Sequence, residues 1–279
     1  MGAALAPSLF WAGQYASHFP QLGFLASTGF QRYFNRSVLI SAFLLLFPTL
    51  QWIGLRRLKS LGLHKNPRRI SHLLGGFALS AGTIFALGAI LFGLGVLQLK
   101  DPFPWILLPP ILLTAISVAL IEESLFRGAI LGLVRQTFTP RPAAVFVSAL
   151  FSIIHFLSPQ KEQIVTVHWY SGFQLLPNSL GRFSDPLIVL GGFTALGILG
   201  LLLAHATIRT SSLWLGIGIH SGLIFGKMSL TKVTKRLQDT TPWFGNDITV
   251  GFGSILILLF LWSLIWIVYL RAEPDSNLP

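Results

Sequence analysis

The sequence predicts an all-α membrane protein, a polytopic transmembrane helical bundle of about seven to eight spans. Hydrophobic residues make up 53% of the 279 residues and charged residues only 10%, whereas an average soluble domain carries about 25% charged residues. The mean hydropathy is +0.70. Several windows reach the roughly 18 to 20 apolar residues that cross a hydrocarbon core, and their helical period fits a bundle better than the alternation of a β-barrel.

The apolar windows divide the chain into three parts. Residues 1–36 form an N-terminal interfacial or re-entrant segment, because aromatic side chains are spread there among Gly, Ser and Pro. Residues 37–271 form one transmembrane helical domain, and residues 272–279 form a polar tail. The expected spans are 37–55, 71–97, 109–134, 143–157, 186–206, 211–225 and 250–270. An eighth span follows if the N-terminal segment crosses the membrane.

Basic residues between the spans predict which ends face the cytoplasm. The densest basic run, from Arg56 to Arg69, follows the first span and is expected to be cytoplasmic. Pro102 and Pro104 predict a short turn on the opposite side. By alternation, the basic stretch from Lys227 to Arg236 also falls on that opposite side, which conflicts with the positive-inside rule. The polar connection 158–185 is long enough to carry a lid or a binding role.

Charge and cysteine content exclude several kinds of function. The formal net charge is +11, but the Lys and Arg residues lie in loops between spans, so we expect no nucleic-acid partner. The chain has no Cys, which excludes disulfides, thiolate metal sites and a cysteine nucleophile. Together with the predicted spans, these features lead us to expect an integral, multi-pass protein of a cell membrane, either the plasma membrane or an inner membrane.

Two acidic residues and one arginine lie inside a predicted span. Of the nine acidic residues, only Glu122 and Glu123 fall within a span, and Arg127 follows Glu123 by four positions. A charge at the centre of a membrane helix costs about 2.5 to 3.5 kcal/mol by insertion scales, so such groups face the protein interior and mark function. The spacing predicts an ion pair between Glu123 and Arg127, whereas Glu122 points about 100° away and needs a partner from another helix.

Two histidines are expected at the depth of Glu122. Counted from the cytoplasmic turns, Glu122, His155 and His220 lie about 20, 20 and 16 Å into their spans, at about 1.5 Å per residue. A cluster of these three side chains is therefore geometrically possible, although a lone His in a membrane helix also serves simply to hydrogen-bond a neighbouring helix. The remaining histidines are expected to be solvated or interfacial: His18, His64, His72, His168 and His205.

Activation of a water molecule is the chemistry that these groups support. A buried Glu can take a proton from water as the water attacks a carbonyl, while His side chains orient the water and stabilise the oxyanion. One Glu and two His also make a ligand set for Zn²⁺ with a fourth position for water, so a metal and a metal-free mechanism both stay open. The sequence has no H-E-x-x-H, no G-x-S-x-G and no Asp within a span, which argues against other intramembrane hydrolases.

Three stretches, in this order, resemble the CPBP family, which includes the CAAX prenyl proteases and the bacteriocin-processing enzymes. Glu122–Arg127 resembles the EExxxR motif, Phe151–His155 the FxxxH motif, and Ser211–His220 the third conserved block. Together they cover a core at about 105–228. The resemblance implies an intramembrane endopeptidase, related to the enzyme that trims prenylated CAAX proteins. Its partners are then the lipid bilayer and a peptide or protein substrate.

The resemblance also implies a role for each matched residue. Glu122 is then the water-activating base, His155 its partner, and His220 an oxyanion-stabilising or water-orienting group, while Glu123 and Arg127 form a supporting pair. Family members have been described both as metalloproteases and as metal-independent glutamate proteases. Zn²⁺ therefore stays open as a cofactor.

Position 224 departs from the family pattern. The last motif usually has Asn or Asp four residues after its His, but Ile224 follows His220 here. An apolar side chain cannot donate to an oxyanion, and loss of one such donor costs about 10² to 10³ in rate in other enzymes. The alternative function is therefore a catalytically weak or inactive scaffold or immunity-like protein that binds a partner through the same cavity. A transporter is a third interpretation, but no inverted repeat supports it.

Overall fold

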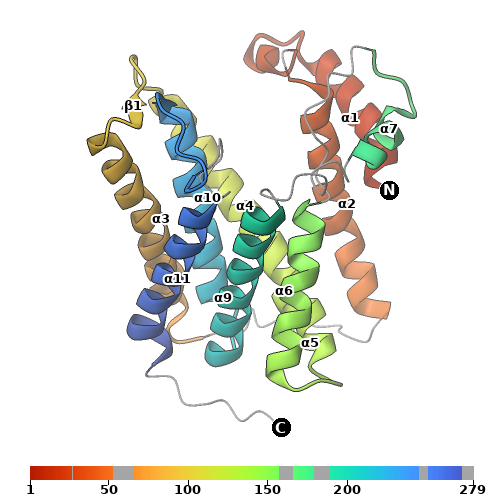
Figure 1. Cartoon of the computed structure of the whole chain (residues 1–279). Coiled ribbons are helices and arrows are strands. Elements are labelled where there is room, and N and C mark those ends of the chain that lie inside the picture. The colour runs from red at the N-terminus through yellow and green to blue at the C-terminus, as the bar shows by residue number, and fades with distance from the viewer. Residues whose placement is uncertain (27, 53–65, 157–165, 179–188, 245–250, 272–279) are drawn as a thin grey trace. The chain divides into compact units, whose positions relative to one another are not determined.

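The computed structural model describes residues 1–26, 28–52, 66–156, 166–178, 189–244 and 251–271 (Figure 1). The chain forms two compact units, residues 1–54 with 153–189 and residues 55–152 with 190–279, here called the first and the second unit. The predicted polar tail and His64 lie outside the described residues.

The first unit is a small helical cluster around the N-terminal helix. Its elements are α1 (Gly2–Ala16), the 3₁₀ helix η1 (Pro20–Leu25), α2 (Phe30–Trp52) and α7 (Ser171–Asn178). Helix α1 packs against both α2 and α7. Their shared core consists of Ala3, Ala6, Phe30, Phe34 and Leu175. The predicted interfacial segment thus contains a regular helix, and the long polar connection contains the short helix α7.

The second unit holds the segments that carry the EExxxR motif and the third conserved block. Its N-terminal elements are α3 (Arg69–Gly93), β1 (Leu97–Leu99), the 3₁₀ turn η3 (Trp105–Leu107), α4 (Leu108–Glu123), the π-helix η4 (Ser124–Ile130), α5 (Leu131–Val134) and most of α6 (Pro140–Phe156). Its C-terminal elements are most of the π-helix η6 (Val189–Phe193), then α9 (Thr194–Thr210), α10 (Trp214–Val233), β2 (Thr234–Arg236), α11 (Phe252–Ile265) and the π-helix η7 (Trp266–Leu270).

Four helical stretches in the described part of the chain are long and apolar enough to cross a membrane. They are Arg69–Gly93, Trp105–Val134, Val189–Thr210 and Phe252–Leu270. A shorter apolar helix runs from Pro140 to His155. These helices confirm the predicted all-α membrane fold. The total of about seven to eight spans and the boundaries at residues 36 and 271 stay predictions.

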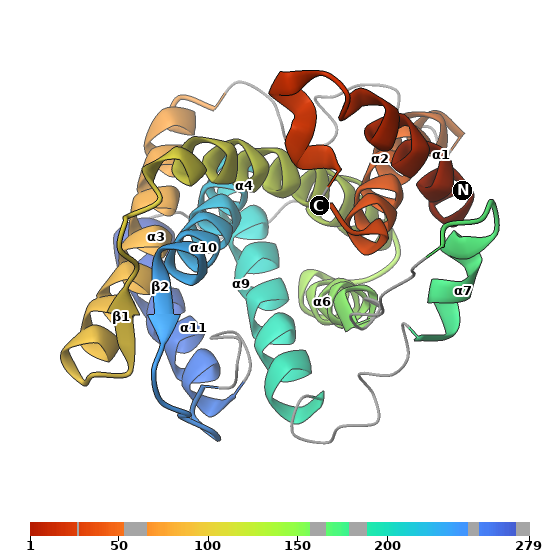
Figure 2. The same ribbon diagram turned by 90° about the horizontal axis from the view of Figure 1, so that it is seen from above.

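Helix α10 is the central helix of the second unit and packs against α3, α4 and α9 (Figure 2). Its glycines recur at every fourth residue, at Gly218, Gly222 and Gly226, on the side that faces α3. A Cβ atom at Gly226 would lie 2.9 Å from the Cβ of Ile84, and one at Gly218 or Gly222 would meet backbone carbonyls of α3. Small residues spaced in this way let two membrane helices approach closely, and here they fix how α10 is rotated against α3.

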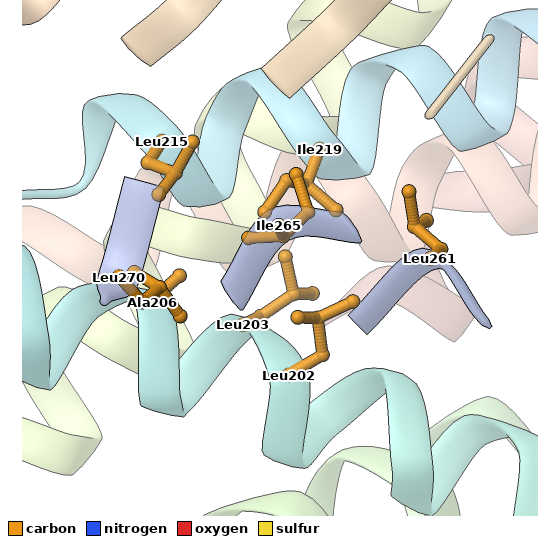
Figure 3. Close-up of a cluster of buried hydrophobic side chains, with 8 residues drawn as sticks. All are labelled: Leu202, Leu203, Ala206, Leu215, Ile219, Leu261, Ile265 and Leu270. Atoms are coloured by element: carbon orange, nitrogen blue, oxygen red, sulfur yellow. The ribbon is translucent and has the colours of Figure 1, made fainter. Parts of the chain in front are cut away.

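A fully buried apolar cluster joins α9, α10 and α11 on another side of α10 (Figure 3). It consists of Leu202, Leu203, Ala206, Leu215, Ile219, Leu261, Ile265 and Leu270. Each of these side chains has no exposed surface. The cluster and the glycine contacts hold α10 on two sides and so fix its rotation about its own axis. The other side chains of α10 therefore point in defined directions.

A two-stranded ribbon shows at which end of the second unit the basic stretch 227–236 lies. Strands β1 and β2 pair antiparallel, with Gln98 opposite Lys235. The Lys100 ammonium also donates to the carbonyl of Lys232 at 2.8 Å, close to the C-terminus of α10. The basic stretch therefore lies at the same end of the unit as the turn after α3, as alternation predicted. Which end of the unit faces the cytoplasm stays a prediction.

Candidate active site

The two intramembrane acids lie where an α-helix changes into a π-helix. Helix α4 ends at Glu123, and the π-helix η4 begins at Ser124 and includes Arg127. π-Bulges are rare and are frequent at functional sites. The Glu123 side chain is fully buried and the Glu122 side chain is 17% exposed. The change in helix type was not foreseen from the sequence, which has no Gly or Pro between Glu122 and Arg127 to signal it.

One carboxylate oxygen of Glu123 binds two cationic or polar partners. Glu123 Oε1 accepts a hydrogen bond from an Arg127 guanidinium nitrogen at 3.0 Å, and both side chains are fully buried. The same oxygen lies 2.8 Å from His220 Nδ1. Because an ionised carboxylate only accepts hydrogen bonds, Nδ1 carries the proton of this bond. Glu123 is therefore the centre of a buried Arg127–Glu123–His220 group.

His220 lies between the two glutamates. While Nδ1 is bonded to Glu123, the other ring nitrogen, Nε2, is 3.7 Å from Glu122 Oε2. At this distance the two atoms are not directly hydrogen-bonded, but a single water or substrate oxygen between them could contact both. His220 therefore lies next to Glu122 while its other ring nitrogen is bound by Glu123.

Arg127 is also fixed by groups on two other helices. A second guanidinium nitrogen donates to the backbone carbonyl of Gly200 in α9 at 3.3 Å. The guanidinium carbon lies 4.4 Å from the ring centroid of Phe151 in α6, within cation–π range. At Gly200 a Cβ would lie 2.8 Å from the Cβ of Ser148, so the lack of a side chain lets α9 and α6 approach each other. In the sequence, Phe151 stands out only as the first position of the FxxxH motif, and no pattern there predicts the role of Gly200.

The second oxygen of Glu123 is packed against the backbone of α10. Glu123 Oε2 is buried and accepts no hydrogen bond from the residues that the structure describes. A Cβ at Gly216 would lie 3.2 Å from this oxygen, tighter than an ordinary van der Waals contact. The glycine at 216 therefore allows the carboxylate to sit against α10, where it can reach His220.

His155 and Ile224 also belong to the motifs that the sequence predicts to form the site. His155 lies in the last turn of α6 and is half-buried, but it belongs to the first unit, so its predicted place beside Glu122 stays a prediction. Ile224 lies one turn after His220 on α10 and is half-buried. Helix α10 is continuous through this region, and the residue one turn after His220 on it is apolar.

The predicted Zn²⁺ ligand set is not assembled within one unit. Across the described residues, no group of three or more His, Cys, Asp or Glu side chains lies together as metal ligands would. Glu122 and His220 supply two of the three expected ligands, and His155, the third, belongs to the other unit. A Zn²⁺ site made of Glu122, His155 and His220 therefore stays a prediction.

Two of the other histidines have structural contacts, and one corrects a prediction. His72 was expected to be solvated or interfacial, but it is only 2% exposed and its ring packs edge-to-face on Tyr269 at 5.4 Å. The prediction was wrong because His72 lies inside α3 and packs against the π-helix η7, which holds Tyr269. His205 is half-buried and accepts a hydrogen bond from the Trp262 indole at 3.0 Å.

Residues 103–226 match a family model described as Type II CAAX prenyl endopeptidase Rce1-like. The matched segment begins before α4 and ends within α10. It therefore includes Glu122, Glu123, Arg127 and His220, as well as both positions of the FxxxH motif. Comparisons with curated proteins and with solved structures give no match.

Proposed function

We propose that this chain is an intramembrane endopeptidase of the Rce1-like, type II CAAX prenyl endopeptidase kind, in which Glu122 activates the attacking water. The match of residues 103–226 to the Rce1-like family model supports the reaction class. The position of His220 supports the assignment of residues, because its ring lies 2.8 Å from Glu123 and 3.7 Å from Glu122. One imidazole thus connects Glu122 to a buried charge pair that orients it.

In the proposed reaction, Glu122 is the general base. Its carboxylate takes a proton from a water whose oxygen attacks the scissile carbonyl carbon, and the proton then passes to the leaving amine as the C–N bond breaks. Negative charge develops on the carbonyl oxygen during the attack, and donors aimed at that oxygen lower the barrier. The resemblance adds His155 as the partner of Glu122.

His220 is the proposed donor to the water or to the oxyanion. Its Nδ1–H is already committed to Glu123, so Nε2 donates only when the ring is doubly protonated. The two neighbouring carboxylates offset the positive charge of that form. The 3.7 Å between Nε2 and Glu122 is too long for a direct hydrogen bond, so the N–H can instead serve an oxygen held between them.

Glu123 and Arg127 are proposed to hold His220 rather than to contact the substrate. Their pair keeps a carboxylate charge next to Nδ1, and that charge fixes which nitrogen of the ring carries the permanent proton. A carboxylate that orients a catalytic imidazole in this way also occurs in hydrolases with unrelated folds.

Cleavage of a prenylated CAAX peptide by the purified chain in phospholipid vesicles tests the proposal. Wild-type protein should release the C-terminal tripeptide, while Glu122→Gln and His220→Ala should each lower the rate at least about 100-fold. Asp101→Asn is the matched control, because Asp101 is an exposed acid outside the predicted spans. Full activity of Glu122→Gln would show that Glu122 is not the base. Inhibition by a chelator, with recovery on adding zinc, would assign the site to a metal-dependent reaction.

A non-catalytic membrane protein that binds a partner is the second candidate function. The observation that favours it is Ile224, which puts an apolar side chain one turn after His220. This candidate predicts that Glu122→Gln leaves the cellular phenotype intact as long as the protein accumulates in the membrane. Location in the plasma or inner membrane belongs to both proposals, and fractionation of membranes tests it.

A further inference from the structure

We infer that Phe151 is a positioning residue of the proposed active site. Its ring holds the guanidinium of Arg127 and the imidazole of His220 in the directions from which both bind Glu123. The inference rests on the proposed peptidase function for its kinetic meaning, but the geometry on which it is built does not depend on that function.

Phe151 contacts both groups that share one oxygen of Glu123. Its ring centroid lies 4.4 Å from the guanidinium carbon of Arg127 and 6.0 Å from the centroid of the His220 ring, at an interplanar angle of 74°. The Phe151 side chain is fully buried. Arg127 and His220 in turn reach Glu123 Oε1 at 3.0 and 2.8 Å. The four side chains therefore form a closed ring of contacts from three helices.

This closed ring has a specific physical consequence. A guanidinium over an aromatic face is attracted by the quadrupole of the ring, and the attraction is stronger where water is excluded. The edge-to-face contact with His220 limits the rotation of the imidazole, which otherwise could turn away from Glu123. Phe151 thus acts on the proposed catalytic imidazole without a polar atom of its own and without reaching the substrate.

Phe126 provides a matched control for Phe151. It is also a buried aromatic residue, at 3% exposure, and it packs edge-to-face on Phe151 with centroids 5.1 Å apart. Its ring centroid is 5.7 Å from the guanidinium carbon of Arg127, near the outer limit of the cation–π range, so its share of that attraction is smaller than that of Phe151 at 4.4 Å. Loss of an aromatic ring at either position removes buried apolar contacts, but only Phe151 has a ring contact with His220 as well as close contact with Arg127.

Fluorinated phenylalanines at position 151 test the inference. Mono-, di- and trifluorophenylalanine weaken the ring quadrupole progressively with little change of shape. We expect kcat for the prenylated peptide to fall stepwise, by about 5- to 30-fold for the trifluoro ring, with KM unchanged. The same series at Phe126 should change kcat by less than about 2-fold. A purely structural role predicts instead that both series leave kcat alone.

Nitrogen NMR of the His220 ring separates failure of this inference from failure of the proposed function. With labelled histidine, Phe151→Leu should move the ring nitrogen signals of His220, and Phe126→Leu should leave them in place. The two signals can be measured whether or not the wild-type protein cleaves the peptide. Signals that move equally in both variants, or in neither, would overturn the role of Phe151, whereas an inactive wild type would overturn only the peptidase proposal.

Discussion

Replacement of Glu123 by Gln is the perturbation with the largest expected effect. Gln keeps the shape and one acceptor oxygen but loses the charge that pairs with Arg127 at 3.0 Å and faces His220 at 2.8 Å. Removal of one partner of a buried charge pair costs about 3 to 5 kcal/mol, because the other charge is left buried and uncompensated. We therefore expect Glu123→Gln to lower the free energy of unfolding by about 3 kcal/mol.

The same change should also lower activity by a separate route. Without the carboxylate, nothing fixes the proton on His220 Nδ1, and the neutral amide can present either its oxygen or its NH₂ group to the ring. In serine protease triads, the corresponding change from acid to amide costs about 10⁴ in kcat because the imidazole takes the wrong tautomer. For Glu123→Gln we expect a fall in kcat of about 10² to 10⁴, measured with the prenylated peptide.

A double variant separates the two routes. Glu123→Gln with Arg127→Gln removes both buried charges, so about 2 kcal/mol of the lost stability should return in thermal unfolding measured in detergent. The activity should not return, because His220 still lacks its carboxylate. Recovery of both properties would mean that Glu123 acts only through folding. Near-normal activity of the single variant would refute the orienting role of Glu123 altogether.

Three further substitutions, one of them with a matched control, test the packing and the site. Gly222→Ala should lower the free energy of unfolding by about 1 to 3 kcal/mol, because a Cβ there would meet a backbone carbonyl of α3. Gly82→Ala is the control: a Cβ at Gly82 would have no atom within 4 Å, so this change should be neutral or stabilising in the same unfolding assay. Gly216→Ala should lower kcat about 10-fold while unfolding changes little, because its Cβ would press on Glu123 Oε2 from 3.2 Å; an unchanged kcat would show that this contact is unimportant. Ile224→Asn should raise the rate of peptide cleavage at least about 10-fold by adding a donor one turn after His220, and a rate no higher than wild type would contradict that idea.

Much of the fold and part of the candidate site could be predicted from the sequence. Apolar length and the positions of charges are local properties, so they predicted the helices that carry the EExxxR motif and the third block. Spacing predicted that Glu123 and Arg127 share a helix face and that Glu122 and His220 have similar depths. The structure has distances of 3.0 Å and 3.7 Å for these two pairs.

The rest depends on how helices rotate against each other, which spacing does not determine. The glycine contacts of α10 with α3 set the direction of His220, and the π-helix after Glu123 changes the direction of the side chains that follow. As a result His220 bonds to Glu123, a contact that the sequence did not predict, although spacing did place His220 at the depth of Glu122. Spacing along the chain predicts how far along its helix a residue lies. Which of the two adjacent glutamates His220 bonds to depends on how the helices pack.

Peptide mapping of protein N- and C-termini in host cells tests the central claim most directly. Cells carry either the wild-type chain or Glu122→Gln at equal membrane abundance, and Asp101→Asn serves as the control for a lost acid. The account predicts new N-termini, or shortened C-termini on prenylated proteins, that appear with wild type and Asp101→Asn and disappear with Glu122→Gln. Identical maps for all three, under conditions where deletion of the chain has a phenotype, would contradict a peptidase and favour the binding protein.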